Sequence, residues 1–196
     1  MLKRLFDIFC SMIGITLLAP LFLLICLLQI ISAGFPIFYI QKRVGKNSTD
    51  FNLYKFRTMR KDSDKLGLLT VGGRDPRITR LGYYLRKYKI DELPQLFNVL
   101  LGTMSLVGPR PEVRKYVDLY TKEQLTILNV KPGITDYASL QFFNENDLLA
   151  QSSSPEETYI QEIMPIKLGL NLKYIEEQSF FIDIRIMVKT VLKIVK

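Results

Sequence analysis

Two adjacent carboxylates, Asp91 and Glu92, lie in the segment KIDELPQ, just after a group of basic residues. A structural explanation is available, because an aspartate can cap a helix and a glutamate in the first turn complements the helix dipole. A chemical explanation is available as well. A carboxylate at a helix start beside Arg86 and Lys89 should have a lowered pKa and stay ionised, and an ionised carboxylate can act as a nucleophile.

Three other segments combine cations with glycine or proline: GGRDPR at 72–77, VGPRPE at 107–112 and KPGIT at 131–135. Such segments suit the binding of phosphate, since they offer side-chain charge together with a fixed backbone. A merely solvated basic face would scatter its charges over flexible helix surface, whereas Arg110 is held between two prolines. The sequence therefore predicts a phosphate-binding site that includes Arg110.

The residue types that are absent restrict the chemistry further. The sequence contains no histidine, which excludes Ser-His and Cys-His pairs, the zincin motif and most transition-metal sites. Cys10 and Cys26 lie in an apolar run without ligand-like spacing, so neither a disulfide framework nor a zinc site is indicated. An acid, base or nucleophile must then be a carboxylate, Lys, Tyr or Cys. A glycosidase fits poorly, because its two acids flank the bond about 5 to 9.5 Å apart.

The segment that precedes these motifs is apolar. No charged residue occurs between Asp7 and Lys42, and this run is longer than the roughly 7 to 15 apolar residues of a signal peptide. We interpret residues 1–41 as a retained membrane anchor. Pro20 lacks the N–H that would bond the carbonyl of Thr16, which predicts a kink. Basic residues flank both ends and favour the cytoplasm for each. Two topologies remain open here, a re-entrant hairpin in one leaflet and a plain spanning helix.

Residues 42–196 have frequent charges and are interpreted as one aqueous domain at the membrane face. The net charge of +8 fits an anionic membrane surface, and no nucleic-acid motif accompanies it. The last helix has a basic stripe, so it either packs on the core or lies on an anionic leaflet. The predicted elements are a strand at 51–59, a loop at 66–79, a helix capped by Thr79 to about 87, and helices from about 91 and at 112–128, 155–174 and 183–196.

The ordered motifs carry a resemblance to a known family. YKFRTM at 54–59, RKYKIDELPQ at 86–95, GTMSLVGPRPE at 102–112 and KPGIT at 131–135 resemble the bacterial sugar transferase family, the monotopic phosphoglycosyl transferases. The resemblance covers nearly the whole chain, from KRLFD at 3–7 through the C-terminal helix. It favours the hairpin topology. The expected fold class is therefore α+β, helix-dominated, with a re-entrant membrane helix hairpin, a small cytosolic catalytic domain containing a short strand element, and amphipathic interfacial helices.

The resemblance implies a two-step reaction. Asp91 attacks the β-phosphate of a UDP-sugar, UMP leaves, and a phosphosugar stays on the enzyme. Polyprenyl (undecaprenyl) phosphate then attacks this intermediate, as the first membrane step of glycoconjugate biosynthesis. Mg²⁺ screens the diphosphate charge, with Asp91 as a ligand, and Glu92 assists with the metal or a proton. The resemblance also implies the bacterial inner membrane, with the catalytic domain on the cytoplasmic face.

Other cations are candidates for substrate binding. Arg110 is expected to stabilise charge on the donor diphosphate. Lys55, Arg57 and Arg86 are weaker candidates for phosphate contacts, with a structural role as the alternative for each. A non-catalytic scaffold or an anionic-lipid-binding protein derived from such an enzyme is the competing hypothesis. The sequence identifies neither the sugar nor the oligomeric state.

The chain departs from the family pattern in two places. Ala19 stands where the family often has a serine before the helix proline, which removes a hydroxyl that could bond a freed carbonyl. After KPGIT many members continue GWAQVNGRN, whereas residues 136–145 here read DYASLQFFNE and contain no arginine. If that arginine helps to hold the nucleotide in relatives, donor binding in this chain is achieved otherwise or is weaker.

Overall fold

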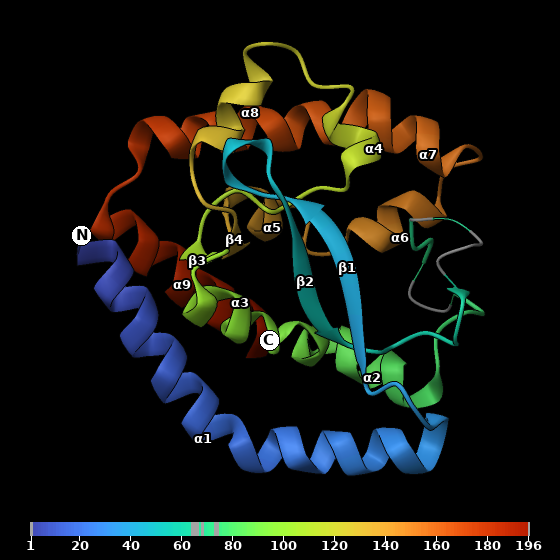
Figure 1. Ribbon diagram of the computed structural model, residues 1–196. Helices are drawn as coiled ribbons and strands as arrows, with labels where there is room; N and C mark the ends of the chain where they lie inside the picture. Colours follow the sequence, from blue (N-terminus) through green and yellow to red (C-terminus); the bar gives the residue numbers. More distant parts are fainter. Residues whose placement is uncertain (1, 64–66, 68, 73–74, 196) are drawn as a thin grey trace.

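The computed structural model describes residues 2–63, 67, 69–72 and 75–195 of the chain. Helices dominate and the strands are short, which confirms the α+β, helix-dominated class. The long N-terminal helix α1 runs below the folded domain, α8 runs along its upper edge, and the hairpin β1–β2 crosses the space between them (Figure 1). Part of the basic loop at 72–77, namely residues 73 and 74, lies outside the described residues.

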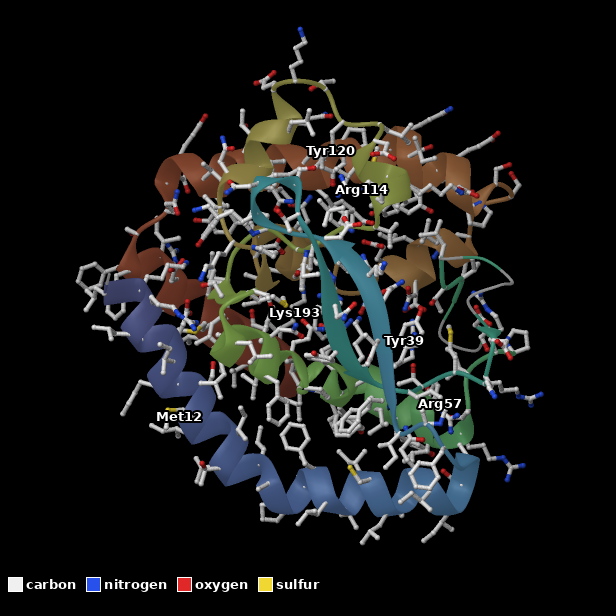
Figure 2. All side chains as sticks on the ribbon, in the orientation of Figure 1. Met12, Tyr39, Arg57, Arg114, Tyr120 and Lys193 are labelled. Carbon is white, nitrogen blue, oxygen red and sulfur yellow. The ribbon has the colours of Figure 1, made fainter. Side chains whose placement is uncertain are left out.

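Helix α1 (Leu2–Ala33) contains Pro20 and is bent into two arms (Figure 1). The kink expected at this proline is thus confirmed, since the proline leaves the carbonyl of Thr16 without its helical donor. The Thr16 hydroxyl donates to the carbonyl of Met12 at 2.9 Å, and Met12 itself points away from the domain (Figure 2). Among the described residues, α1 is the one helix long and apolar enough to cross a membrane.

Charged side chains fasten the N-terminal arm of α1 to the domain. The Asp7 carboxylate accepts hydrogen bonds from the Ser105 hydroxyl at 2.9 Å and from the Leu106 N–H at 3.1 Å. The Lys3 ammonium group donates to the Asp183 carboxylate at 2.5 Å. Asp7 is buried, so its charge is compensated within the protein rather than by solvent.

The C-terminal arm of α1 is fastened to the same domain by packing. Ile25 is buried in a cluster with Phe56 and Leu85, and the buried Gln29 amide donates to the carbonyl of Arg57. Because both arms contact one domain, α1 follows the surface of that domain along both arms and bends between them (Figure 1). A straight helix of 32 residues would instead separate its ends by about 48 Å.

The predicted strand at 51–59 is confirmed as β2 (Asp50–Phe56), and its partner β1 (Phe38–Val44) was not predicted. The two are antiparallel, with Phe38 opposite Phe56 and Val44 opposite Asp50. The anchor helix ends at Ala33, earlier than the expected boundary near residue 41, because β1 begins inside the same charge-free run. A charge-free run has no period that separates a strand from a helix.

The segment around the two carboxylates begins as expected and then differs. Thr79 caps α2 (Arg80–Lys87) and accepts a hydrogen bond from the Gly82 N–H at 2.9 Å, as predicted. The predicted start of an α-helix at Asp91 is wrong. Residues 90–92 form a 3₁₀ turn, η3 (Ile90–Glu92), and the α-helix that follows is α3 (Gln95–Leu101). Pro94 has no N–H to bond the carbonyl of Ile90, so the α-helix begins after it.

The GPRP and KPGIT segments are joined by a short parallel pair that was not predicted, β3 (Ser105–Val107) with β4 (Gly133–Thr135). Two glycines permit the close approach. A Cβ on Gly133 would lie 2.1 Å from the Gly108 nitrogen, and the Gly133 N–H donates to the carbonyl of Pro109 at 3.0 Å. The backbone on the N-terminal side of Arg110 is therefore held rigidly against the second motif.

The C-terminal half is helical, with one correction. The helix expected at 112–128 is wrong: α4 (Arg114–Val117) and the 3₁₀ segment η4 (Gln124–Asn129) are separate. Thr121 and Gln124 form a reciprocal capping pair, at 2.9 and 3.3 Å, that starts a new turn. The helices expected at 155–174 and 183–196 are confirmed as the elements from α7 to α9. These later elements are α5 (Tyr137–Gln141), α6 (Glu145–Ala150), α7 (Pro155–Thr158), the π-helical η5 (Tyr159–Ile163), α8 (Met164–Glu177) and α9 (Phe180–Val195).

Candidate active site

A cavity of about 600 Å³ lies between the β1–β2 hairpin, η3, the loop after β3, the segment from α5 to α6, and the end of α9. All the substrate-binding and catalytic candidates from the sequence line this one cavity. They are Asp91, Glu92, Lys55, Arg57, Arg86 and Arg110. Residues from five separate parts of the chain thus meet around the adjacent carboxylates.

Glu92 is the centre of a partly buried ion-pair network. Its carboxylate accepts two hydrogen bonds from the Arg110 guanidinium, one of them at 3.0 Å, and a third from the Lys55 ammonium group at 3.0 Å. Burial by itself would raise the pKa of Glu92, but the charges of Arg110 and Lys55 outweigh it and hold that pKa well below its usual range. Glu92 is therefore an anion that positions two cations, which disfavours a role as a proton donor.

The pKa of Asp91 is shifted in the opposite direction from that of Glu92, and the predicted lowering of the Asp91 pKa is wrong. Burial raises the pKa of Asp91, and the adjacent Glu92 carboxylate raises it further. Arg86 and Lys89 act in the expected direction, but they do not overcome these two effects. Lys55, which donates a hydrogen bond to Glu92, also lowers the pKa of Asp91 but does not reverse the shift. The Asp91 carboxyl group consequently faces the cavity from a site where its charged form is unfavourable.

The backbone of Arg110 is positioned by a residue that sequence reasoning did not select. Asp136 is fully buried; one of its oxygens accepts the Arg110 N–H at 3.0 Å and the other caps α5 by accepting the Ser139 N–H at 2.6 Å. In the sequence, Asp136 was noticed only as a departure from the family pattern. An aspartate directly after the KPGIT segment and before a possible helix was the available signal.

Arg57 lines the cavity, but its guanidinium donates its hydrogen bonds to carbonyls at the C-terminal end of α1. Its guanidinium donates to the carbonyls of Ala33 at 2.7 Å, Gly34 at 2.6 Å and Phe35 at 3.2 Å, at the end of α1. Figure 2 shows Arg57 directly above the C-terminal arm of this helix. These contacts match the structural alternative for Arg57, since the last carbonyls of a helix need donors. Arg86, on α2, adds its positive charge to the surroundings of Asp91.

A polar group at another part of the cavity wall was also missed. The buried Tyr159 hydroxyl donates to the Glu112 carboxylate at 2.7 Å, and the Lys167 ammonium group bonds Glu145 at 2.8 Å and lies 3.4 Å from the Tyr159 hydroxyl. Tyr159 begins the π-helical turn η5. These contacts join residues up to 47 positions apart, so no local pattern indicated them. The group gives this wall donors and acceptors suited to hydroxyl-bearing ligands.

The cavity can offer Mg²⁺ one carboxylate ligand, so a magnesium ion would need substrate and water for its other ligands. Within the part of the chain that the structure describes, no cluster of three or more His, Cys, Asp or Glu side chains could hold a metal. Mg²⁺ at phosphoryl-transfer sites is commonly held by one or two carboxylates, with water and substrate phosphates as the other ligands. Asp91 supplies one such carboxylate, whereas both Glu92 oxygens already accept hydrogen bonds from cations. A metal here would depend on the substrate for most of its ligands.

Comparison with known proteins gives a consistent result. The family model described as "Bacterial sugar transferase" matches residues 1–196. A Bacillus subtilis (strain 168) protein, "Uncharacterized sugar transferase EpsL", is 40% identical over 98% of this chain and 87% of its own length. An Aeromonas hydrophila "UDP-N-acetylgalactosamine-undecaprenyl-phosphate N-acetylgalactosaminephosphotransferase" is 37% identical over 97% of this chain. A Komagataeibacter xylinus "Undecaprenyl-phosphate glucose phosphotransferase" is 36% identical over 96% of it. The chain spans 43% of the Aeromonas protein and 35% of the Komagataeibacter protein.

Proposed function

The chain belongs to the bacterial sugar transferase family, and from this premise we propose that it transfers a sugar 1-phosphate from a UDP-sugar to polyprenyl (undecaprenyl) phosphate. The observation that carries the proposal is the placement of Asp91 in a cavity beside the Glu92–Arg110–Lys55 network. The Aeromonas and Komagataeibacter relatives are named as phosphotransferases that act on undecaprenyl phosphate. The product would enter the synthesis of a polysaccharide, O-antigen or glycoprotein glycan.

In the first half of the proposed reaction, an oxygen of the ionised Asp91 carboxylate attacks the β-phosphorus of the donor. A phosphorus–oxygen bond forms to Asp91, the bond from the β-phosphorus to the bridging oxygen breaks, and UMP leaves with that oxygen. Arg110 and Lys55 hold positive charge at Glu92, the residue adjacent to Asp91, on the wall of the cavity that would receive the diphosphate. Asp91 would also hold Mg²⁺, which, when bound, neutralises charge on the diphosphate.

In the second half, an oxygen of the acceptor phosphate attacks the phosphorus of the phosphosugar on Asp91. The bond to Asp91 breaks, its carboxylate is restored, and the sugar leaves as part of a polyprenyl diphosphate. The acceptor needs no base when it arrives as a dianion, because the second pKa of a phosphate monoester is about 6. Only the donor half of the reaction releases UMP, so the two halves are separable by experiment.

The function is tested with purified protein in a neutral detergent, a panel of UDP-sugars, Mg²⁺ and a polyprenyl phosphate. We expect sustained UMP release from at least one donor, and this release must depend on the acceptor after the first turnover. Sustained release without acceptor would indicate a hydrolase instead. No release from any donor of the panel would leave the non-catalytic scaffold or anionic-lipid-binding protein as the better hypothesis.

We also propose that α1 is a re-entrant hairpin in the cytoplasmic leaflet of the inner membrane, so that the catalytic domain lies at the cytoplasmic face. Its two arms contact one domain, and its outward side is apolar. A spanning helix would carry one of its ends to the other side of the bilayer, away from the domain that both arms contact. A hairpin keeps the cavity close to the headgroups, where the phosphate of a lipid-linked acceptor lies.

The topology is tested by introducing single cysteines at Leu2 and Lys46, one at each side of the hairpin, in a chain with Cys10 and Cys26 replaced by alanine. Both positions are exposed. We expect a membrane-impermeant maleimide to label neither in intact spheroplasts and both in inverted vesicles, because both ends of the hairpin face the cytoplasm. Labelling of the Leu2 position alone in intact spheroplasts would show that the helix spans the membrane.

A further inference from the structure

Two ammonium groups lie against the aromatic ring of Phe143, at the cavity wall. The Lys89 nitrogen is 5.0 Å from the ring centroid, and the Lys193 nitrogen is 5.4 Å from it. Three elements meet here: Lys89 directly precedes η3, Phe143 follows α5, and Lys193 lies near the end of α9. Figure 2 shows Lys193 near the middle of the molecule, although it is close to the end of the chain.

Two positive charges that share one ring repel each other. The face of an aromatic ring attracts a cation and offsets part of this repulsion, and the Lys193 ammonium group also donates to the carbonyl of Leu140 at 2.6 Å. No ion pair among the described residues joins either ammonium group to a carboxylate. A dianion at the edge of the ring, within reach of both ammonium groups, would relieve the repulsion and accept charge-assisted hydrogen bonds.

The ring also lies close to the reaction centre. Phe143 and Lys89 line the same cavity as Asp91. Lys89 precedes Asp91 by two residues in the chain. An anion held by Lys89 would therefore be next to a group bound to Asp91.

The surroundings of this cation pair are apolar on one side. Met187, Val191 and Ile194, on α9, line the cavity beside Phe143, and Val191 is 59% exposed. Val191 thus reaches both the cavity and the outer surface of the domain, where further apolar side chains of α9 are exposed. A ligand with a phosphate at one end and a long hydrocarbon chain at the other matches this combination of charge and apolar surface.

We propose that Lys89, Phe143 and Lys193 form the binding site for the phosphate of the acceptor, with its hydrocarbon chain leaving along α9. This proposal rests on the proposed function and assigns the second half of the reaction to named residues. Lys89 binds the phosphate dianion from the cavity side and Lys193 from the adjoining groove between α8 and α9, while the Phe143 ring contacts both ammonium groups. The bound phosphate then supplies the oxygen that forms the new bond to phosphorus, and the bond from that phosphorus to Asp91 breaks.

The position of Phe143 also bears on the second departure from the family pattern. In the pattern GWAQVNGRN the eighth residue after KPGIT is arginine, and the eighth residue here is Phe143. The segment lacks a cation of its own, but two cations reach it from other elements. Positive charge beside Phe143 thus comes from Lys89 and Lys193 rather than from an arginine within residues 136–145.

The test compares Lys193→Ala with Lys189→Ala. Lys189 lies one turn earlier on α9, is exposed, and borders the groove between α8 and α9 that Lys193 also borders. Both variants lose one positive charge from the same helix, so Lys189→Ala controls for general attraction to anionic lipid. In neutral detergent we expect the KM for polyprenyl phosphate to rise about tenfold or more in Lys193→Ala, the size of a lost charge-assisted hydrogen bond. The Lys189 variant should match the parent.

Two further measurements keep the result interpretable. Lys193→Arg should recover most of the acceptor affinity, and Phe143→Leu should weaken it as Lys193→Ala does. The burst of UMP in the absence of acceptor should keep its amplitude in Lys193→Ala, because the donor half does not use this site. Equal KM values for the Lys193 and Lys189 variants would overturn the proposal, and so would loss of the burst, which would assign the cations to the donor. Absence of a burst in the parent protein would contradict the proposed function itself.

Discussion

Asp91→Asn abolishes UMP release from the donor, with an expected loss of at least about a thousandfold, because an amide cannot supply the carboxylate nucleophile. The variant should unfold at the same temperature as the parent or at a higher one. Burial and the adjacent Glu92 both raise the pKa of Asp91, which means that the folded protein disfavours its charge. The protonated Asp91 carboxyl group therefore stabilises the folded protein at low pH, and this stabilisation is lost as the pH rises through the raised pKa. At neutral pH the amide removes an unfavourable charge.

The measurements are initial rates of UMP release and thermal unfolding in the same detergent, with Asp118→Asn as the control. Asp118 is exposed and lies outside the cavity lining. In the parent protein, the rate of the donor half should fall on the acidic side as the pH decreases through the raised pKa of Asp91, hence above the ordinary value of about 3.9. An Asp91→Asn variant that turns over like the parent would refute the assignment of the nucleophile.

Glu92→Gln lowers both stability and rate, in contrast to the change at Asp91. The glutamine leaves the partly buried Lys55 and Arg110 without their anion; removal of one partner from a fully buried ion pair costs about 3 kcal/mol in the free energy of unfolding, and we expect a smaller loss of about 1 to 2 kcal/mol here. Because Arg110 and Lys55 also lose their fixed positions, we expect the donor half to slow by about 100-fold. The two variants are therefore expected to separate a role of Asp91 toward substrate from a role of Glu92 in positioning the cations.

The comparison is made by denaturant unfolding and initial rates at pH 7, with the exposed Glu123→Gln as the control. The lowered pKa of Glu92 means that its stabilising effect is present above the ordinary value of about 4.3 and is lost as the pH falls through the lowered pKa. The stability difference between parent and variant should therefore shrink under acid conditions. Unchanged unfolding at neutral pH would show that the network around Glu92 is dispensable.

Local signals in the sequence were sufficient for several elements of the fold. The cap at Thr79, the kink at Pro20 and the helices at the C-terminus each depend on residues within a turn or two of one another. The parallel pair β3–β4 depends on contact between Ser105 and Gly133, which no local pattern reveals. The break near Thr121 was visible as a threonine three residues before a glutamine, and it was overlooked inside a helical pattern.

In the candidate site, too, local motifs were predictable from the sequence and long-range contacts were not. Motifs with charged residues located the lining of the cavity, and all six predicted side chains are there. The direction of the Asp91 pKa shift was not predictable, because it depends on burial and on the Glu92 carboxylate, which together outweigh the nearby cations. Asp136 was missed for a similar reason, since its importance comes from the hydrogen bond it accepts from the Arg110 backbone 26 residues away.

Hydrogen bonds connect both arms of α1 to the parts of the chain that line the cavity. The carboxylate of Asp7 on α1 accepts hydrogen bonds from Ser105 and Leu106 in β3, and β3 leads directly into the loop that carries Arg110. At the other arm, the Arg57 guanidinium joins the cavity wall to the end of α1. If α1 is the proposed re-entrant hairpin, these contacts fix the height of the cavity above the lipid.

The most direct test of the central claim is mass spectrometry of the protein after brief incubation with a donor UDP-sugar and Mg²⁺, without acceptor. We expect the peptide that contains Asp91 to gain the mass of one sugar phosphate on that side chain, and the adduct to disappear when polyprenyl phosphate is added. Turnover of donor without any adduct, or an adduct on Glu92 instead, would contradict a covalent intermediate at Asp91.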